Sequence, residues 1–245
     1  MAILLCSSAT TAQAADLNFC LLDDNIYPVI DRTNADKGKP GVWVEFGHAI
    51  ARRMGLTLKV HYRPGRRCLR EISEGTLDGI LGASYVEERE AFGAYPMKDG
   101  KLDLDKSTLS LTYNVYQNRG AKIIWDGTSL DKTTPIFAPL GWSVSKHLKK
   151  MGANVRDIPN PKKMFEMLKR GRVNHMATLS GLADIILESG KYPGIIKTEP
   201  PIRSKPYYIM LSRQFLKTKP KRAQVFWDTI PVVKEEELEA LLAKY

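Results

Sequence analysis

The sequence predicts an α/β protein of two lobes, each a mostly parallel sheet flanked by helices, with two crossover segments joining the lobes. Short apolar runs alternate with amphipathic stretches from residue 17 onward, as in βαβ units. The same order of elements then occurs a second time, although the two series share little sequence. Two such lobes form a clamshell. Ligands of open α/β sheets bind beyond the carboxyl ends of the strands, so the loops of both lobes would surround one cleft.

The first series reads as β-α-β-α-β. Residues 44–54 place their apolar side chains on one helical face, and Gly55 ends that helix. Residues 58–62 alternate apolar and polar side chains, which is typical of a strand with one buried face. The elements expected, in order, are a strand over 17–22, a helix over 44–54, a strand over 58–62, a helix over 68–75 and a strand over 77–83.

The second series is marked by helix-start signals. Ser143 and Ser180 can each cap a helix, and Asn160-Pro161 combines an N-cap with a proline in the first turn. The elements expected are a strand over 135–138, a helix over 143–151, a strand over 155–158, a helix over 162–170, a strand over 173–179 and a helix over 182–188.

Two extended stretches separate these series. Residues 110–117 are rich in Thr, Tyr and Val, and residues 199–208 contain three prolines. A further strand and a helical tail follow the second stretch. We therefore expect lobe 1 to contain residues 16–113 and 205–245, and lobe 2 to contain residues 114–204.

Composition narrows the function classes. The 245 residues allow about 100 per lobe, enough for a core in each. No apolar run reaches the roughly 18–20 residues of a membrane span, so no integral membrane segment is expected. The formal net charge of +10 favours anionic partners. The basic residues are dispersed, however, and their densest cluster, residues 217–222, lacks any zinc-finger, RNA-recognition or arginine-rich signature, so we expect no nucleic-acid partner.

Residues 1–15 are expected to be a cleaved signal peptide. They carry no charge, contain a short apolar stretch, and offer small residues at Ala12 and Ala14, as signal peptidase requires. The positively charged residues with which signal peptides begin are missing. This leaves either a leader that begins further upstream or a chance Ala/Ser/Thr tail.

Export would leave two cysteines, Cys20 and Cys68, and an oxidising compartment favours their pairing as one disulfide. The alternative is two buried thiols that never meet.

Segments in both lobes resemble family 3 of the bacterial extracellular solute-binding proteins, over nearly the whole chain after the leader. Residues 41–55 (GVWVEFGHAIARRMG) are similar to the family's Gly-Phe-Asp-x-Asp-Leu-Ala-x-x-Ile-Ala-x-x-Leu-Gly. Three further segments resemble Leu-x-x-Leu-x-x-Gly-x-x-Asp-x-Ile, Gly-Met-Thr-Ile-Thr-Pro-Glu-Arg and Leu-x-x-Gly-Arg-Val, namely residues 69–80, 82–89 and 168–173. Residues 141–143 (GWS) stand where the family has Gly-Thr-Thr.

The resemblance implies a monomeric periplasmic protein that captures a small anionic or zwitterionic ligand, an amino acid or organic anion, between its lobes. It implies delivery to an ABC permease and no cofactor. The ligand group would be Arg89 on the carboxylate, Ser84 and Ser143 beside it, Tyr27 as an aromatic wall, and Asp24, Arg67 and Trp142. Arg89 as a surface arginine, Ser143 as a plain N-cap and Tyr27 as a core residue are the alternatives.

One departure concerns ligand charge. Amino-acid binders of this family place an Asp after a second-lobe strand to hold the α-ammonium group, and Leu179 stands at that position here. Asp184 lies one helical turn further and is expected to point elsewhere. A cleft containing Arg89 and Arg67 without an obvious acid would suit an anion better than a zwitterion, because a buried ammonium needs a counter-charge.

We expect no enzyme and no metal site, because the four histidines are scattered and no hydrolase elbow, phosphate loop or dinucleotide motif occurs. Cyclohexadienyl dehydratases resemble this family, and Glu45 and Asp24 are the nearest acid or base candidates for such chemistry. A third class is a periplasmic accessory or sensor protein, for example one associated with a quinoprotein dehydrogenase. Leu179 and Trp142 fit that class as well as they fit anion uptake.

Overall fold

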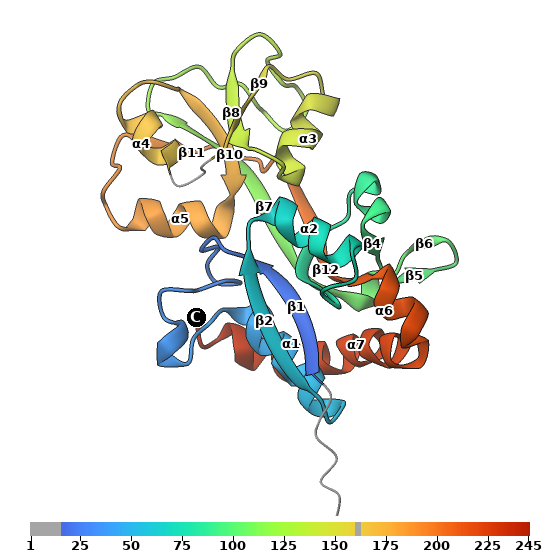
Figure 1. Ribbon diagram of the computed structural model, residues 1–245. Coiled ribbons are helices and arrows are strands. Elements are labelled where there is room, and N and C mark those ends of the chain that lie inside the picture. Colours follow the sequence, from blue (N-terminus) through green and yellow to red (C-terminus); the bar gives the residue numbers. More distant parts are fainter. Residues whose placement is uncertain (1–15, 160–162) are drawn as a thin grey trace, which may run out of the picture.

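The computed structural model describes residues 16–159 and 163–245, and it has the predicted α/β class (Figure 1). The predicted signal peptide and the Asn160-Pro161 helix start lie outside the described residues. In Figure 1 the elements form two groups, one above the other, joined by two long strands. Lobe 1, the lower group, begins with β1 (Asp16–Leu22), α1 (Val42–Arg53), β2 (Thr57–Arg63), α2 (Gly65–Ser73) and β3 (Gly79–Ser84).

Lobe 2, the upper group, repeats this alternation. Its elements are β8 (Ile136–Pro139), α3 (Ser143–Lys150), β9 (Val155–Ile158), α4 (Met164–Lys169), β10 (His175–Leu179), α5 (Ser180–Glu188) and β11 (Ile195–Lys197). In both lobes the strands expected from the sequence pair in parallel: β1 with β2 and β3, and β8 with β9 and β10.

The two predicted crossover segments are central strands of one sheet. They form β7 (Ser107–Asn118) and β12 (Arg203–Ser212), which pair antiparallel with each other. The strand order is β2-β1-β3-β12-β7-β10-β8-β9, so the sheet passes through both lobes without a break. The predicted lobe boundaries at 113/114 and 204/205 fall inside β7 and β12, and the exact point of division stays a prediction.

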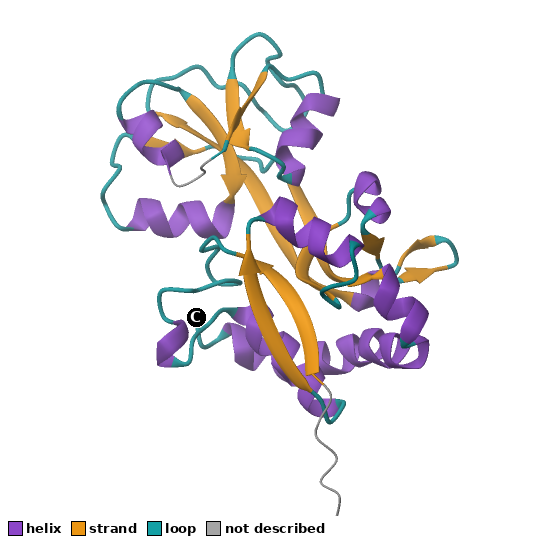
Figure 2. Ribbon diagram, viewed as in Figure 1, coloured by secondary structure: helices purple, strands orange, loops and turns teal. Residues whose placement is uncertain are grey.

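Short elements and two helices complete lobe 1. Helices α1 and α7 (Pro220–Leu242) pack together on one face of the sheet, and Phe19 of β1 stacks on Phe226 of α7 with ring centroids 5.1 Å apart. Figure 2 shows the long α7 beneath the strands of this lobe. The remaining elements are η1 (Ala35–Lys37), η2 (Glu87–Ala91), β4 (Gly93–Ala94), β5 (Met97–Lys98), β6 (Lys101–Leu102), η3 (Leu104–Lys106), α6 (Arg213–Thr218) and α7 (Pro220–Leu242).

The predicted serine caps are wrong. Trp142 and Leu179 occupy the N-cap positions of α3 and α5, and neither side chain caps its helix. Ser143 and Ser180 are the first helical residues instead. Their hydroxyls turn toward β7, where Ser143 donates to Tyr113 and Ser180 lies within hydrogen-bonding distance of the side-chain oxygen of Asn114. Each hydroxyl therefore forms a hydrogen bond with a side chain of β7 instead of capping the backbone of its own helix.

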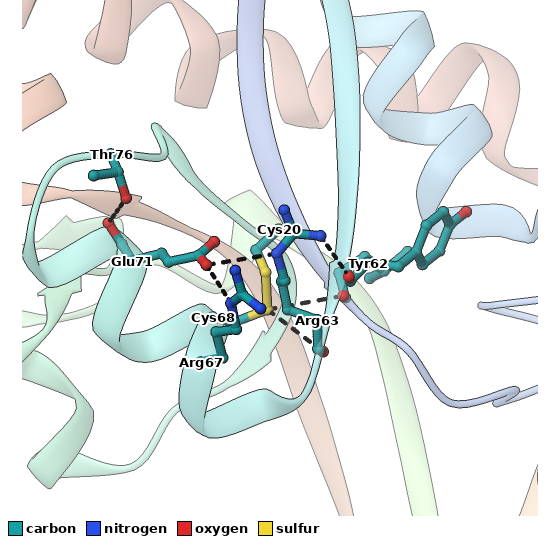
Figure 3. The surroundings of a disulfide bond; sticks show 8 residues. Cys20, Tyr62, Arg63, Arg67, Cys68, Glu71 and Thr76 are labelled. Carbon is teal, nitrogen blue, oxygen red and sulfur yellow. Dashed lines mark hydrogen bonds and ion pairs between the residues drawn. A yellow bond between two sulfur atoms is a disulfide. The ribbon is translucent and has the colours of Figure 1, made fainter.

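The predicted disulfide is confirmed. Cys20 in β1 is bonded to Cys68 in α2, with the two Cα atoms 5.6 Å apart (Figure 3). Glu71, one turn along α2, forms ion pairs with Arg67 and with Arg63 at the end of β2. The disulfide attaches α2 to β1 and the Arg63–Glu71 pair attaches it to the end of β2, whereas the Arg67–Glu71 pair lies within α2 itself. Within residues 16–159 and 163–245, no helix is long and apolar enough to cross a membrane, and no metal-binding group of His, Cys, Asp and Glu occurs.

Candidate ligand-binding cleft

A cavity of about 640 Å³ lies between the lobes. Its lining from lobe 1 comes from the end of β1, the starts of α1 and α2, the end of β3 and η2. Its lining from lobe 2 comes from residues 139–143 and Lys146 at the start of α3, from Pro159 after β9 and from Leu179 at the end of β10. The strands contribute at their carboxyl ends, as expected for parallel sheets. The volume falls within the range of small-molecule sites.

Arg89 lines this cavity and is held by Ser84 at the carboxyl end of β3. Its Nη1 donates to the carbonyl oxygen of Ser84 at 2.8 Å and lies 3.4 Å from the Ser84 hydroxyl. The Tyr95 hydroxyl donates to the same carbonyl at 3.0 Å. One nitrogen of the guanidinium is therefore fixed by the protein, which sets the direction of the whole planar fork.

Two buried tyrosines on the strands that join the lobes line the cavity. Tyr113 of β7 and Tyr207 of β12 share a hydrogen bond through their phenol oxygens, and Ser143 of lobe 2 donates to Tyr113 at 3.4 Å. Burial raises the pKa of both phenols, so both stay neutral. The sequence analysis did not identify these tyrosines as site residues. The only signal for them was that they lie within the two predicted crossover segments, residues 110–117 and 199–208.

Aromatic and aliphatic side chains form one wall of the cavity. The Trp43 ring lies tilted against Tyr207 with centroids 5.2 Å apart, and it passes directly over Gly82. Trp142 lines the cavity from lobe 2. Leu179 also lines it, at the position where the sequence comparison expected an Asp in amino-acid binders. An apolar wall beside a few fixed polar groups is typical of sites for small organic ligands.

The cavity contains acids as well as bases. Asp23 and Asp24 line it directly after β1, and Arg66 lines it at the start of α2. Glu88 and Lys146 also line it and form an ion pair at 3.3 Å that joins η2 of lobe 1 to α3 of lobe 2. The expectation of a cleft without an obvious acid is therefore wrong: it rested on Leu179 at the position after β10, whereas Asp24, which was itself expected at the site, lines the cavity together with Asp23 and Glu88. The lining can offer opposite charges to both an anionic and a cationic ligand group.

Two of the residues expected at the site do not line the cavity. Tyr27 packs edge-on against Tyr245 with centroids 6.0 Å apart, and Arg67 points to solvent and pairs with Glu71. Their chain neighbours Ile26 and Arg66 line the cavity instead. A shift of one residue on a loop or at a helix start reverses which side chain faces inward, and the sequence motif does not determine that rotation.

The other acids considered from the sequence have partners elsewhere. Asp184 accepts a hydrogen bond from Tyr116 at 2.6 Å and pairs with Lys197 at 2.8 Å, away from the cavity as expected. Glu45 accepts from the Tyr245 hydroxyl at 2.6 Å and pairs with Lys244.

No family model and no curated protein matches the sequence, whereas many solved structures match the fold. An ancestral arginine-binding protein bound to arginine has a TM-score of 0.73 at 17% identity, covering 94% of this chain and 98% of its own. A putative ABC transporter binding component from Wolinella succinogenes, complexed with lysine, has a TM-score of 0.73 at 12% identity, covering 94% and 95%. A histidine kinase sensor domain with similarity to periplasmic binding proteins has a TM-score of 0.75 at 17% identity, covering 95% and 96%. The chain therefore has the two-lobed α/β fold of the type II periplasmic binding proteins.

Proposed function

We propose that this protein binds a small carboxylate-bearing ligand, an amino acid or an organic anion, in the cavity between its lobes. The observation that carries the proposal is Arg89, a guanidinium fixed by Ser84 beside a cavity that both lobes line. Guanidinium pairs with carboxylate through two parallel hydrogen bonds. The hydroxyls of Ser84 and Ser143 add polar groups to the lining from lobe 1 and lobe 2.

Ligand binding would shift the protein toward a closed form. Only a closed cavity lets residues of both lobes contact the ligand at once, so the ligand has a higher affinity for that form. In this proposal the protein is exported to the periplasm by residues 1–15, acts as a monomer, and presents its closed face to an ABC permease. The fold shared with a binding component of an ABC transporter supports this role.

We propose no catalytic step. The solved structures with this fold named above are binding proteins and a sensor domain, which supports binding without chemistry. Glu45 contacts Tyr245 and Lys244 and lies outside the cavity lining, so it is badly placed to act as a general base on a bound ligand.

A sensing or accessory role is the second candidate, and the fold shared with a histidine kinase sensor domain favours it. In that role the closed form would contact a partner protein instead of a permease. The neighbouring genes distinguish the two roles. A permease and ATPase pair supports uptake, and a kinase or dehydrogenase gene supports sensing or an accessory role.

The binding proposal is tested by a thermal-shift screen of amino acids, dicarboxylates and aromatic acids, followed by calorimetry with the best ligand. Arg89→Ala should weaken binding about tenfold or more, since a hydrogen bond to a charged group contributes about 1.5–3 kcal/mol. Arg67→Ala is the matched control, because it removes an exposed arginine outside the lining and should leave the affinity unchanged. Equal affinity in the wild type and Arg89→Ala would remove Arg89 from the site.

A further inference from the structure

Positively charged side chains gather beside the cavity, where α3 faces the first residues of β12. Arg203 and Lys205 alternate along β12 and therefore lie on the same side of the strand. His147 and Lys150 lie one turn apart or less on α3. Arg203 joins the two elements, because its Nη1 donates to His147 Nδ1 at 3.4 Å. Figure 1 shows α3 above the part of β12 that passes between the lobes.

Lys205 is the buried member of this group. Lys205 is only 8% exposed, and its ammonium group donates a hydrogen bond to the carbonyl oxygen of Tyr85. Burial, followed by the charges of Arg203 and Arg89, lowers the pKa of Lys205 to about 8. Glu88 offsets part of this positive charge, but its carboxylate is paired with Lys146 at 3.3 Å.

His147 is affected by the same positive charges. Its pKa is lowered by burial and then by the charges of Arg203, Lys205 and Lys150. Because Arg203 donates to Nδ1, the ring proton of neutral His147 lies on Nε2, which makes this nitrogen a further donor. Arg203 and His147 thus bring β12 and α3 into contact, and Lys205 and Lys150 lie near enough for their charges to act on His147. The mutual repulsion of these cations would be relieved by an anion of high charge.

We propose that residues Arg203, Lys205, His147 and Lys150 form a second ligand site, an oxyanion site that takes a phosphate-type dianion beside the main cavity. Guanidinium and ammonium groups together suit a tetrahedral oxyanion, because the arginine fork binds two oxygens while the lysines neutralise charge. The dianion is either free phosphate or the phosphate group of a ligand whose carboxylate reaches Arg89. Only the second source rests on the proposed function.

The test is calorimetric titration of the full chain with inorganic phosphate at low ionic strength and pH 7. We expect saturable 1:1 binding that Arg203→Gln combined with Lys150→Gln weakens about tenfold or more. Both residues are exposed, so this variant should fold. Lys217→Gln combined with Lys221→Gln is the matched control, since it removes two exposed cations from the densest basic cluster and should leave phosphate affinity within about twofold.

Lys205→Met provides an independent variant that keeps most of the length of the side chain, removes its charge and should also weaken phosphate binding. Absence of saturable phosphate binding, or an equal loss in the Lys217/Lys221 control, overturns the site. Titration with phosphoserine identifies the source. An affinity well above that of phosphate, reduced by Arg89→Ala, shows that the cavity ligand carries the anion, whereas equal affinities show that free phosphate is the occupant. Both of these results support the site.

Discussion

Gly82 determines where the aromatic wall of the cleft can lie. A Cβ atom at this position would stand 2.4 Å from the Trp43 ring, well inside contact distance. We expect Gly82→Ala to lower the free energy of unfolding by about 1–3 kcal/mol through overpacking. Urea unfolding followed by tryptophan fluorescence measures the loss. Gly194→Ala is the matched control because a Cβ there meets open space. A loss no greater than in this control would contradict the packing argument.

Lys205 makes stability depend on pH in a definite direction. Its pKa is about 8 in the folded protein, below the roughly 10.4 of an ordinary lysine, so the folded state binds fewer protons than the unfolded state between these two values. Stability from this group therefore increases as pH rises through and beyond 8. We expect the melting temperature of the wild type, relative to that of Lys205→Met, to rise between pH 7 and pH 9.5. A difference that stays constant or falls would contradict the burial of a cation at this position.

At the scale of the elements, the Cys20–Cys68 bond attaches α2 to β1. It closes a sequence separation of 48 residues, and α2 supplies Arg66 to the cavity. Replacing both cysteines by serine should cost about 2–4 kcal/mol of stability, because the unfolded chain is no longer constrained. Thermal melts with and without reductant measure this effect. The reductant should lower the melting temperature of the wild type and leave the double-serine variant unchanged.

Most elements could be predicted because their signals are local. The apolar periodicity of α1 and the alternation in β2 depend on residues close together in the chain, and both elements appear within a few residues of the expected bounds. The helix starts of α3 and α5 were less predictable. Ser143 and Ser180 have partners on β7, more than 25 residues away, and those partners compete with local capping.

At the scale of the whole molecule, the Glu88–Lys146 ion pair joins the two lobes across the cavity. Both side chains are about half exposed, so the pair contributes little to stability on its own. Its position across the cavity gives it influence on the balance between open and closed forms. We expect Glu88→Gln to weaken ligand affinity about twofold to fivefold and to increase the radius of gyration of the ligand-free protein in X-ray scattering.

A double-mutant cycle isolates this coupling. Glu88→Gln and Lys146→Gln should each weaken affinity, and the double variant should be no weaker than the poorer single variant. Glu166→Gln is the control, because it breaks a pair with Lys191 inside lobe 2 and should not change the affinity. Fully additive losses would show that the two side chains act independently.

The sequence by itself determined the order of elements and the repeated α/β series, and its family resemblance indicated a group of residues that lie at one cavity: Arg89, Ser84, Ser143, Asp24 and Trp142. It left open whether Cys20 and Cys68 meet, which the fold decided. Tertiary structure alone decided that Tyr113 and Tyr207 meet in the lining of the cavity, that Asp23 lines it, and that Tyr27 and Arg67 do not. The reason is that β7 and β12 pair across some ninety residues, so the side chains facing the cleft depend on long-range register and loop rotation, which no local pattern encodes.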